Sequence, residues 1–295
     1  MKTIAKKAAR LLMDSGRYWA TSPPLQDFLI KHVAPITLDP AMLSREYTVR
    51  PIWRLNARVL CQPYLFPHMR VFWFGRLESV PLDNFLRRHL HAGDTFLDVG
   101  ANCGQYTTIA STLVQDKGRV IAFEPSHDMQ QLLATHVRSQ QLKNVTLHNV
   151  ALGSAASVGE LQFNRTAPGC STLRTDLTVT GETFSQPCNL VRGDDVLNGE
   201  EIKGNTILKV DVEGHELECL RGLQNSLKHF VKFALIEITP AWIGGIRGVE
   251  EMWSIMGRAG LHGHLITPSG EIGALLEASD IPLDEQTDVV FCRNS

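Results

Sequence analysis

A run of small and polar residues from Asp98 to Gly104 separates an apolar segment from a helical one. In an open α/β sheet the ligand crevice forms where a strand turns into a helix, and glycines there let a ligand approach the backbone. Glu124 ends the next apolar segment, 20 residues beyond Gly104. We therefore expect its carboxylate beside the loop, where it can accept both ribose hydroxyls of an adenosine.

The glycine spacing of this loop separates two classes of nucleoside cofactor. A dinucleotide fingerprint is G-x-G-x-x-G, but here Gly100 is followed two places on by Asn102, so the pyrophosphate cradle is missing. S-adenosylmethionine has no phosphate and carries an amino-acid head, so Asp98 can face it without repelling a pyrophosphate. The pattern favours the sulfonium cofactor. An NAD(P)-dependent oxidoreductase and a non-catalytic cofactor-binding scaffold stay as alternatives.

A second set of carboxylates is expected at the same edge of the sheet. In ILKVDVEGHE a strand period of two puts Lys209, Asp211 and Glu213 on one face, and Glu237 ends the next apolar run. One carboxylate can act as general base toward an acceptor hydroxyl, or several can hold Mg²⁺. His215 is a further candidate base. The structural alternative is that Lys209 only neutralises Asp211.

Strands alternate with helices after Gly93, which predicts a doubly wound α/β domain. Ser126 is placed as the N-cap of the second helix. Residues 153–193 interrupt the alternation with Gly, Ser, Thr and Asn and are expected to form an inserted hairpin or loop. A late helix precedes two extended segments, HGHLITP and TDVVFCR. The five strands predicted before them are TFLDVGA, GRVIAFEP, VTLHNVAL, NTILKVDVEG and VKFALIEI.

The N-terminal 75 residues lack the alternation of strands and helices that follows Gly93. Residues 2–12 form a basic amphipathic helix that we expect to dock on its own domain or on a second copy in a homodimer. Contact with an anionic membrane surface is the alternative. Prolines and aromatic residues over 21–75 predict a cap of short strands and turns, including a strand over MRVFWFGRL, and PLDNFLRRHL reads as a helix.

Composition is that of an ordinary globular protein, with 43% hydrophobic and 20% charged residues. A formal net charge of -2 gives no reason to expect a nucleic-acid partner. The six cysteines form no Cys-x-x-Cys pair, and we find neither a membrane-spanning run nor a signal-peptide core. We expect a cytoplasmic protein with a small-molecule or glycan partner.

The segments FLDVGANCGQYT, AFEPS, HNVALG, LKVDVEGHELECLRG and LIEITP, in this order, resemble the FkbM-type family of S-adenosylmethionine-dependent methyltransferases. The resemblance covers roughly residues 76–240. It implies a Rossmann-like class I methyltransferase fold, a seven-stranded, mostly parallel sheet whose last strand is antiparallel. The domain would span 76–295 and follow an N-terminal helical and β cap over 1–75. The implied reaction is O-methylation of a hydroxyl on a sugar, glycan or natural product, with S-adenosylhomocysteine as product.

The carboxylates of the second set are ranked from their own placement, apart from the resemblance. Asp211 is the first candidate for base or hydroxyl orienter, with Glu213 and Glu237 behind it, and these three carboxylates are also the candidate Mg²⁺ ligands. By position, the resemblance implies that the methionine part is bordered by Asp98, Gly100, Asn102 and Gly104, the ribose by Glu124, and the adenine by Asn149 and Ala151. Ser126 is a further cofactor-binding candidate.

Overall fold

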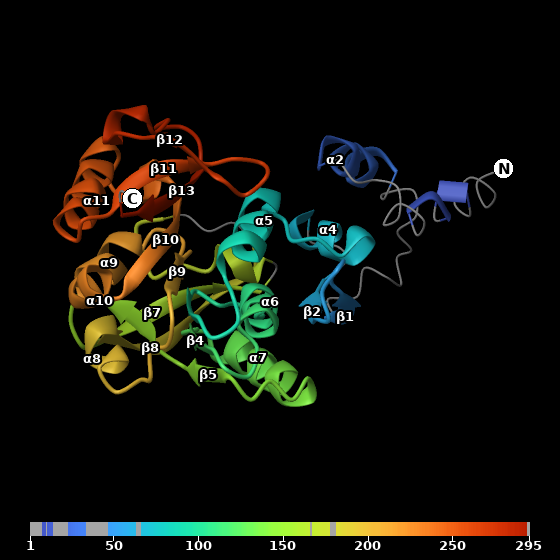
Figure 1. Ribbon diagram of the computed structural model, residues 1–295, viewed down its shortest axis with the longest axis horizontal. Coiled ribbons are helices and arrows are strands. Elements are labelled where there is room, and N and C mark those ends of the chain that lie inside the picture. Colours follow the sequence, from blue (N-terminus) through green and yellow to red (C-terminus); the bar gives the residue numbers. More distant parts are fainter. Residues whose placement is uncertain are drawn as a thin grey trace. The chain divides into compact units, whose positions relative to one another are not determined.

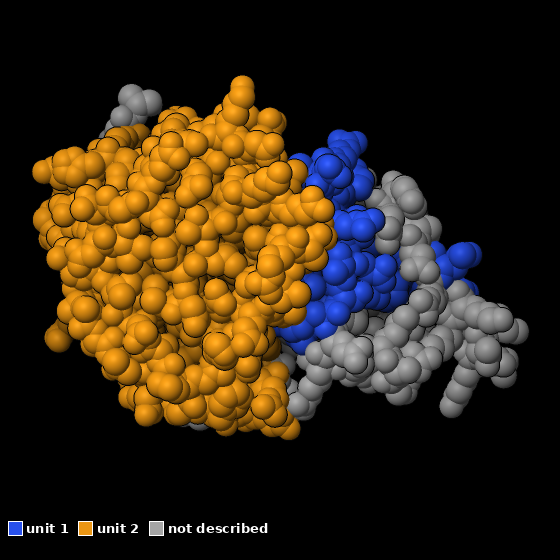
Figure 2. Space-filling model, turned by 90° about the horizontal axis from the view of Figure 1, so that it is seen from below, with its two compact units in different colours: residues 1–84 blue, residues 85–295 orange. Residues whose placement is uncertain are grey.

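The computed structural model describes residues 8–9, 11–13, 23–33, 47–62, 66–165, 167–177 and 181–293. The chain divides into two compact units, residues 1–84 and 85–295 (Figure 2). The domain boundary expected after residue 75 stays a prediction. Most of the amphipathic helix expected over 2–12 lies outside the described residues. No helix in the described ranges is both long and apolar enough to cross a bilayer.

Unit 1 consists of short elements. Helix α2 (Pro23–His32) is followed by β1 (Thr48–Pro51) and β2 (Arg58–Cys61), which pair antiparallel, and then by α4 (Phe66–Phe74). The strand predicted over MRVFWFGRL was wrong, because α4 occupies most of it. Val71, Phe72, Trp73 and Phe74 are all buried, and a short run that is buried on every side carries no period that separates helix from strand.

Unit 2 is built on an eight-stranded sheet with the order β12-β11-β13-β10-β9-β3-β4-β5. Five strands run parallel, and β13 is antiparallel to its neighbours on both sides. This confirms the class I, Rossmann-like fold. The strands are β3 (Thr95–Val99), β4 (Arg119–Phe123), β5 (Val145–His148), β9 (Thr206–Val210), β10 (Val231–Ile238), β11 (His262–Ile266), β12 (Ile272–Leu275) and β13 (Thr287–Cys292).

The expected count of seven strands was one too few. The additional strand is β12, which pairs antiparallel with β11 through a turn over 267–270. The sequence Pro268-Ser269-Gly270 thus lies in the turn of a tight hairpin that leads to a strand we did not predict. Ile272 and Leu275 are exposed, so β12 lacks the buried face that produces a recognisable alternation.

Apolar residues of the sheet alternate between its two faces. Leu97 and Val99 of β3 pack in one core and Phe96 in the other. Figure 1 shows α6 and α7 on one side of the sheet and the later helices on the other. The helices of unit 2 include the end of α5 (Val80–His89), then α6 (Gln105–Val114), α7 (His127–Ser139), α8 (Gly193–Leu197), α9 (Glu216–Gly222), α10 (Gln224–His229) and α11 (Ile246–Arg258).

Residues 153–193 contribute a second, smaller sheet. Strands β7 (Ser157–Asn164) and β8 (Thr183–Arg192) pair antiparallel over the whole of β7, and β6 (Ala151–Gly153) joins the end of β8 in parallel. The connection between β7 and β8 begins with a 3₁₀ turn, η2 (Pro168–Cys170). This connection reaches the carboxyl edge of the large sheet, as its contacts below show.

The close approach of β3 and β9 at this edge requires a glycine at position 100. Gly100 has a φ of 83°, and a Cβ there would lie 1.9 Å from the backbone oxygen of Asp211. We expect Gly100→Ala to lower the free energy of unfolding by more than about 3 kcal/mol, since strain and a backbone clash add.

The matched control is Gly257→Ala in α11, because a Cβ at Gly257 meets nothing within 4 Å. That variant should be neutral or stabilising by up to about 1 kcal/mol, as expected for Gly→Ala in a helix. Urea denaturation of both variants measures the difference. Equal stabilities for the two would contradict the close approach.

Candidate active site

The loop from Asp98 to Gly104 joins β3 to α6 at the point where the strand order reverses. Gly100, Asn102 and Gly104 all have positive φ, so the loop turns sharply. The amides of Gly100 and Ala101 both donate to the carbonyl of Phe123 at 3.0 Å, which ties the loop to the end of β4. The crevice of a doubly wound sheet opens at such a reversal.

Packing within the protein explains why Gly100 and Gly104 are glycines, which the sequence alone did not indicate. We expected them to admit a ligand, but the missing Cβ atoms make room for the protein itself. The oxygen of Asp211 lies over Gly100, and the Leu133 side chain, 2.2 Å from an added Cβ, lies over Gly104. The loop is therefore held in shape by β9 and α7.

Asp98 lies beneath this loop and is fully buried. Its Oδ2 accepts a hydrogen bond from the Thr107 hydroxyl, while Oδ1 has no partner among the described residues. Burial raises the pKa of Asp98, and the nearby Lys209 ammonium opposes the rise. An unpartnered buried oxygen is costly, so a ligand with a donor group has a reason to bind near it.

Glu124 is held beside the loop as expected. Its Oε2 accepts from the amide of Asn102 and its Oε1 from the amide of Ser126, each at 2.8 Å. The residue is only 7% exposed, and burial raises the pKa of its carboxyl to about 7. Each oxygen keeps a lone pair. Two such acceptors match a pair of adjacent hydroxyls, so the residues present fit the ribose of a nucleoside.

The other candidate cofactor residues surround Glu124. Ser126 is the N-cap of α7, as predicted, and its hydroxyl accepts from the amide of Met129. Asn149 is exposed and donates its Nδ2 to the carbonyl of Glu124 at 2.8 Å, whereas Ala151 is buried in β6. Asn149 thus fixes the turn after β4, and its exposed position leaves it reachable by a ligand.

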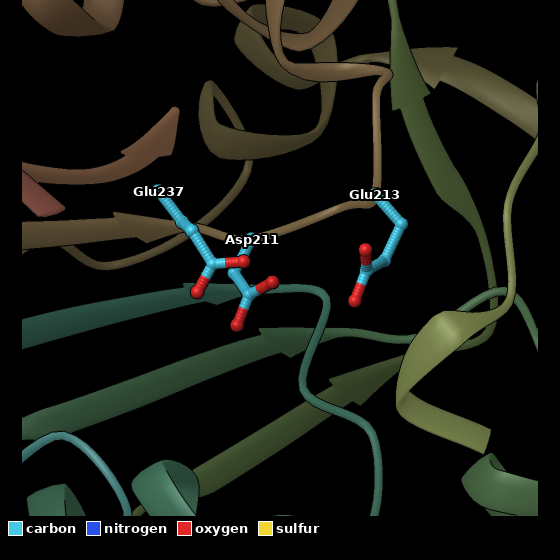
Figure 3. Close-up of side chains that lie close together, drawn as sticks. All are labelled: Asp211, Glu213 and Glu237. Carbon is cyan, nitrogen blue, oxygen red and sulfur yellow. The ribbon is translucent and has the colours of Figure 1, made fainter. Parts of the chain in front are cut away.

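Asp211, Glu213 and Glu237 come together at the ends of β9 and β10. One carboxylate oxygen from each lies within 4.8 Å of the others, and Figure 3 shows the three side chains gathered at the sheet edge. One detail of the prediction was wrong. The strand ends at Val210, and Glu213 has a φ of 54°, so a turn and not strand alternation brings its carboxylate to the cluster.

Lys209 supplies the positive charge next to this cluster. Its Nζ lies 2.7 Å from Asp211 Oδ2 and 4.7 Å from the centre of the Tyr106 ring. Lys209 is 3% exposed; burial opposes its charge, but Asp211 and Asp98 outweigh burial and raise its pKa. The predicted neutralisation of Asp211 is therefore present, together with the open carboxylate cluster.

Glu237 is expected to carry a proton near neutral pH. Burial and the charge of Asp211 both raise the pKa of Glu237 well above its usual range. A neutral acid beside a carboxylate of a different environment is a common arrangement in general acid–base sites. The pair can hold one proton between them.

The three carboxylates are spaced closely enough for a divalent cation, but the ammonium of Lys209 already neutralises one of them. The donor set therefore fits Mg²⁺ without requiring it. A hard cation and Lys209 would compete for Asp211, and no step of the chemistry below passes through a metal.

Glu216 is the residue of this site that our sequence reasoning missed. Its Oε1 accepts from the amides of Val212 and Gly214 at 3.3 and 3.1 Å, on either side of Glu213. Its Oε2 has no partner among the described residues, and burial raises the pKa of the carboxyl to about 7. The last glutamate of DVEGHE was the available signal, because a buried acid one turn after a strand end can bind free amides.

The inserted connection also contacts the cluster. The Thr172 hydroxyl donates to the carbonyl of Glu213 at 2.6 Å, and Arg174 donates through Nη1 to the carbonyl of Trp242. Glu213 is thus held from two sides, by Glu216 through its flanking amides and by Thr172 through its carbonyl. His215, the further candidate base, has a buried Nε2 without a partner among the described residues, and burial lowers its pKa.

Comparison with known proteins agrees with this geometry. The family model for the methyltransferase FkbM domain matches residues 98–262. A hexuronic acid methyltransferase, AglP, of Haloferax volcanii is 33% identical over 148 residues, which cover 49% of this chain and 56% of that protein. Methyltransferase 1 of Beauveria bassiana is 28% identical over 166 residues, covering 49% of this chain and 65% of that protein.

The chain therefore spans between half and two thirds of the length of these curated relatives. Among solved structures, the crystal structure of Methyltransferase FkbM from Methylobacillus flagellatus aligns with a TM-score of 0.44 and 15% identity. That alignment covers 68% of this chain and 43% of the other.

The raised pKa of Glu216 makes a prediction about stability. The folded state holds this proton more tightly than the unfolded state, whose carboxyl has a pKa of 4.5. Between pH 4.5 and about 7 the unfolded state therefore loses its proton first, and the free energy of unfolding falls as pH rises. We expect Glu216→Gln to remove about 1–3 kcal/mol of this pH-dependent loss, because Gln cannot ionise.

Denaturant unfolding at pH 5 and pH 8 measures the effect, with the exposed Glu250→Gln as control. The difference in stability between Glu216→Gln and the unsubstituted chain should grow in favour of the variant as pH rises. Parallel pH curves for the two proteins would show that the Glu216 carboxyl is not buried as described.

Proposed function

Because the chain belongs to the methyltransferase FkbM domain family, we propose that it transfers a methyl group from S-adenosylmethionine to a hydroxyl oxygen of a sugar or glycan. The observation that carries this proposal is the pairing of two sites at one sheet edge. A ribose-type carboxylate, Glu124, lies beyond β4, and an acid–base cluster around Asp211 lies beyond β9. The first suits a nucleoside and the second suits a hydroxyl.

The cofactor, when bound, supplies an electrophilic methyl group on a sulfonium centre. The loop from Asp98 to Gly104 and Glu124 would hold its amino-acid and ribose parts. Asp98 Oδ1 and Asn102 Oδ1 are buried oxygens without partners among the described residues, and both are acceptors for an ammonium group. Their placement supports an amino-acid head over a pyrophosphate, which would be repelled.

Asp211 is the proposed orienter and base for the acceptor hydroxyl. Lys209 engages its Oδ2, which leaves Oδ1 to accept the hydrogen bond of an incoming hydroxyl. The proton then moves to the Asp211 carboxylate, because Glu237 already holds a proton of its own. Positioning of the oxygen in line with the methyl group would supply much of the rate.

A sugar acceptor is supported by the relative from Haloferax volcanii, which is named for hexuronic acid. The polar cluster supports the same class, because sugars present several hydroxyl donors and carboxylates accept from them. The insertion over 153–193 and the start of α11 would shape the acceptor side.

Cofactor binding is testable by calorimetry with S-adenosylhomocysteine and with NAD. We expect micromolar binding of the first and none of the second. Glu124→Ala should weaken the binding of S-adenosylhomocysteine at least about tenfold, because the two hydrogen bonds that its ribose donates to the carboxylate are lost. The exposed Glu250→Ala is the charge-matched control and should bind like the unsubstituted chain. Binding of NAD in place of S-adenosylhomocysteine would point to an oxidoreductase.

Methyl transfer is testable with radiolabelled S-adenosylmethionine and fractionated glycans or cell extract. Asp211→Asn should reduce kcat about 100-fold or more while S-adenosylhomocysteine binding changes little, because the amide cannot take the proton. The exposed Asp284→Asn is the control. Full turnover by Asp211→Asn would remove it from the reaction, and tight cofactor binding with no labelled product from any fraction would favour a scaffold.

A further inference from the structure

A separate cavity of about 350 Å³ opens beside the carboxylate cluster, in a part of unit 2 that the cofactor residues do not line. Gly214, which directly follows Glu213, forms part of its wall. The start of α11 forms another part, through Arg247 and Gly248 in its first turn and Gly244 just before it. Its volume is within the range of small-molecule sites, which begins at about 300 Å³.

The inserted connection links this cavity to the proposed reaction centre. Thr172 donates to the carbonyl of Glu213, and two residues later Arg174 lines the cavity. Arg174 is fixed there because its guanidinium donates to Asp176 and to the carbonyl of Trp242. One short segment therefore contacts both places, and the cavity wall at Gly214 directly follows Glu213 in the chain.

The carboxylates of the cavity are partly engaged. Arg221 donates to Glu251 Oε1 through Nε and Nη2, at 2.8 and 2.6 Å, and to Glu218 Oε1 through Nη1. Glu218 Oε2 also accepts from Ser154. The second oxygen of Glu251 is left to accept from a ligand hydroxyl. A hydroxylated ring is therefore matched at this wall.

Arg247 is the cation of the cavity that no described carboxylate neutralises. It is exposed, and it forms no hydrogen bond or ion pair with the described residues. It also stands in the first turn of a 13-residue helix that has no side-chain cap and no acidic residue in that turn. The unsatisfied amides and the helix dipole place further positive potential beside the guanidinium, so an anion is favoured there.

We propose that this cavity binds the carboxylate end of an acidic sugar, with Arg247 as the group that recognises the carboxylate. The inference rests on the proposed function, because it requires a sugar hydroxyl to be the methyl acceptor. Three arginines and two glutamates line the cavity. Arg221 pairs with both glutamates and Arg174 pairs with Asp176, so Arg247 is the lining cation without a carboxylate partner in the described chain. A neutral sugar would satisfy the glutamate but leave Arg247 unpaired, whereas a uronate satisfies both.

The test measures binding and does not depend on turnover. The full-length chain, saturated with S-adenosylhomocysteine, is titrated with D-glucuronate and with D-glucose by saturation-transfer NMR. We expect Arg247→Glu to weaken glucuronate binding at least about tenfold, as the loss of a charge-assisted pair predicts, and to leave glucose binding within about twofold. Arg247→Lys should retain part of the affinity, because the charge remains but the bidentate geometry is lost.

The matched control is Arg258→Glu. Arg258 lies in the last turn of the same helix, is exposed and donates only to Ser254 in the described chain, so the variant makes the same change in net charge. It should bind glucuronate like the unsubstituted protein. Equal losses in the two variants, or equal affinity of the unsubstituted chain for glucose and glucuronate, would overturn the proposal.

Two further outcomes separate this inference from the proposed function. If S-adenosylhomocysteine does not bind but Arg247→Glu still selectively loses glucuronate, the cavity assignment stands and the methyltransferase proposal fails. If the cofactor binds, and neutral sugars are methylated while glucuronate does not bind, only the cavity assignment fails. A parallel titration with glucose 6-phosphate identifies the anion, since tighter binding than glucuronate would contradict a carboxylate site.

Discussion

The buried ammonium of Lys209 compensates two carboxylates, one on β3 and one directly after the end of β9. The charge balance of the site depends on this ammonium. Asp98 stands opposite Lys209 in the register of β3 and β9, and Asp211 accepts directly from its Nζ. Removing one member of such a buried set costs about 3–5 kcal/mol, since the remaining charge has no partner. The ring of Tyr106 lies against the same ammonium. This contact also ties α6, the helix that follows β3, to the charge of Lys209.

Lys209 can compensate both carboxylates only because the backbone holds the ends of β3 and β9 level with each other at the sheet edge. The Asp211 carbonyl lies over Gly100, and the Asp211 amide donates to the carbonyl of Val99 at 3.1 Å, so the two strand ends stay in register. The strand has ended at Val210, and the chain turns at Glu213, whose φ is 54°. Glu216 accepts from the amides on either side of Glu213, and this turn aims its carboxylate back toward Asp211.

Most of the sheet and the position of Glu124 beside the loop could be predicted because their signals are local. Buried parallel strands are continuous apolar runs, and Glu124 is placed by its distance from Gly104 alone. Strand β12 and helix α4 could not be predicted, since an exposed edge strand and the continuous buried run over residues 70–74 both lack a period. Glu216 acts through backbone amides, and the cavity at Arg247 joins residues far apart in sequence, so neither has a sequence pattern.

This difference in predictability follows the division of the proposed site into two halves. The cofactor half uses the ends of β3 and β4 and the residues that follow them directly, so one short motif fixes it. The acceptor half uses the connection between β7 and β8 and the first turn of α11, and both halves meet at Glu213, which Glu216 and Thr172 hold from opposite sides. Under the proposed function, a change of acceptor would need new residues at positions such as 174 and 247, while the charges around Lys209 would stay as they are.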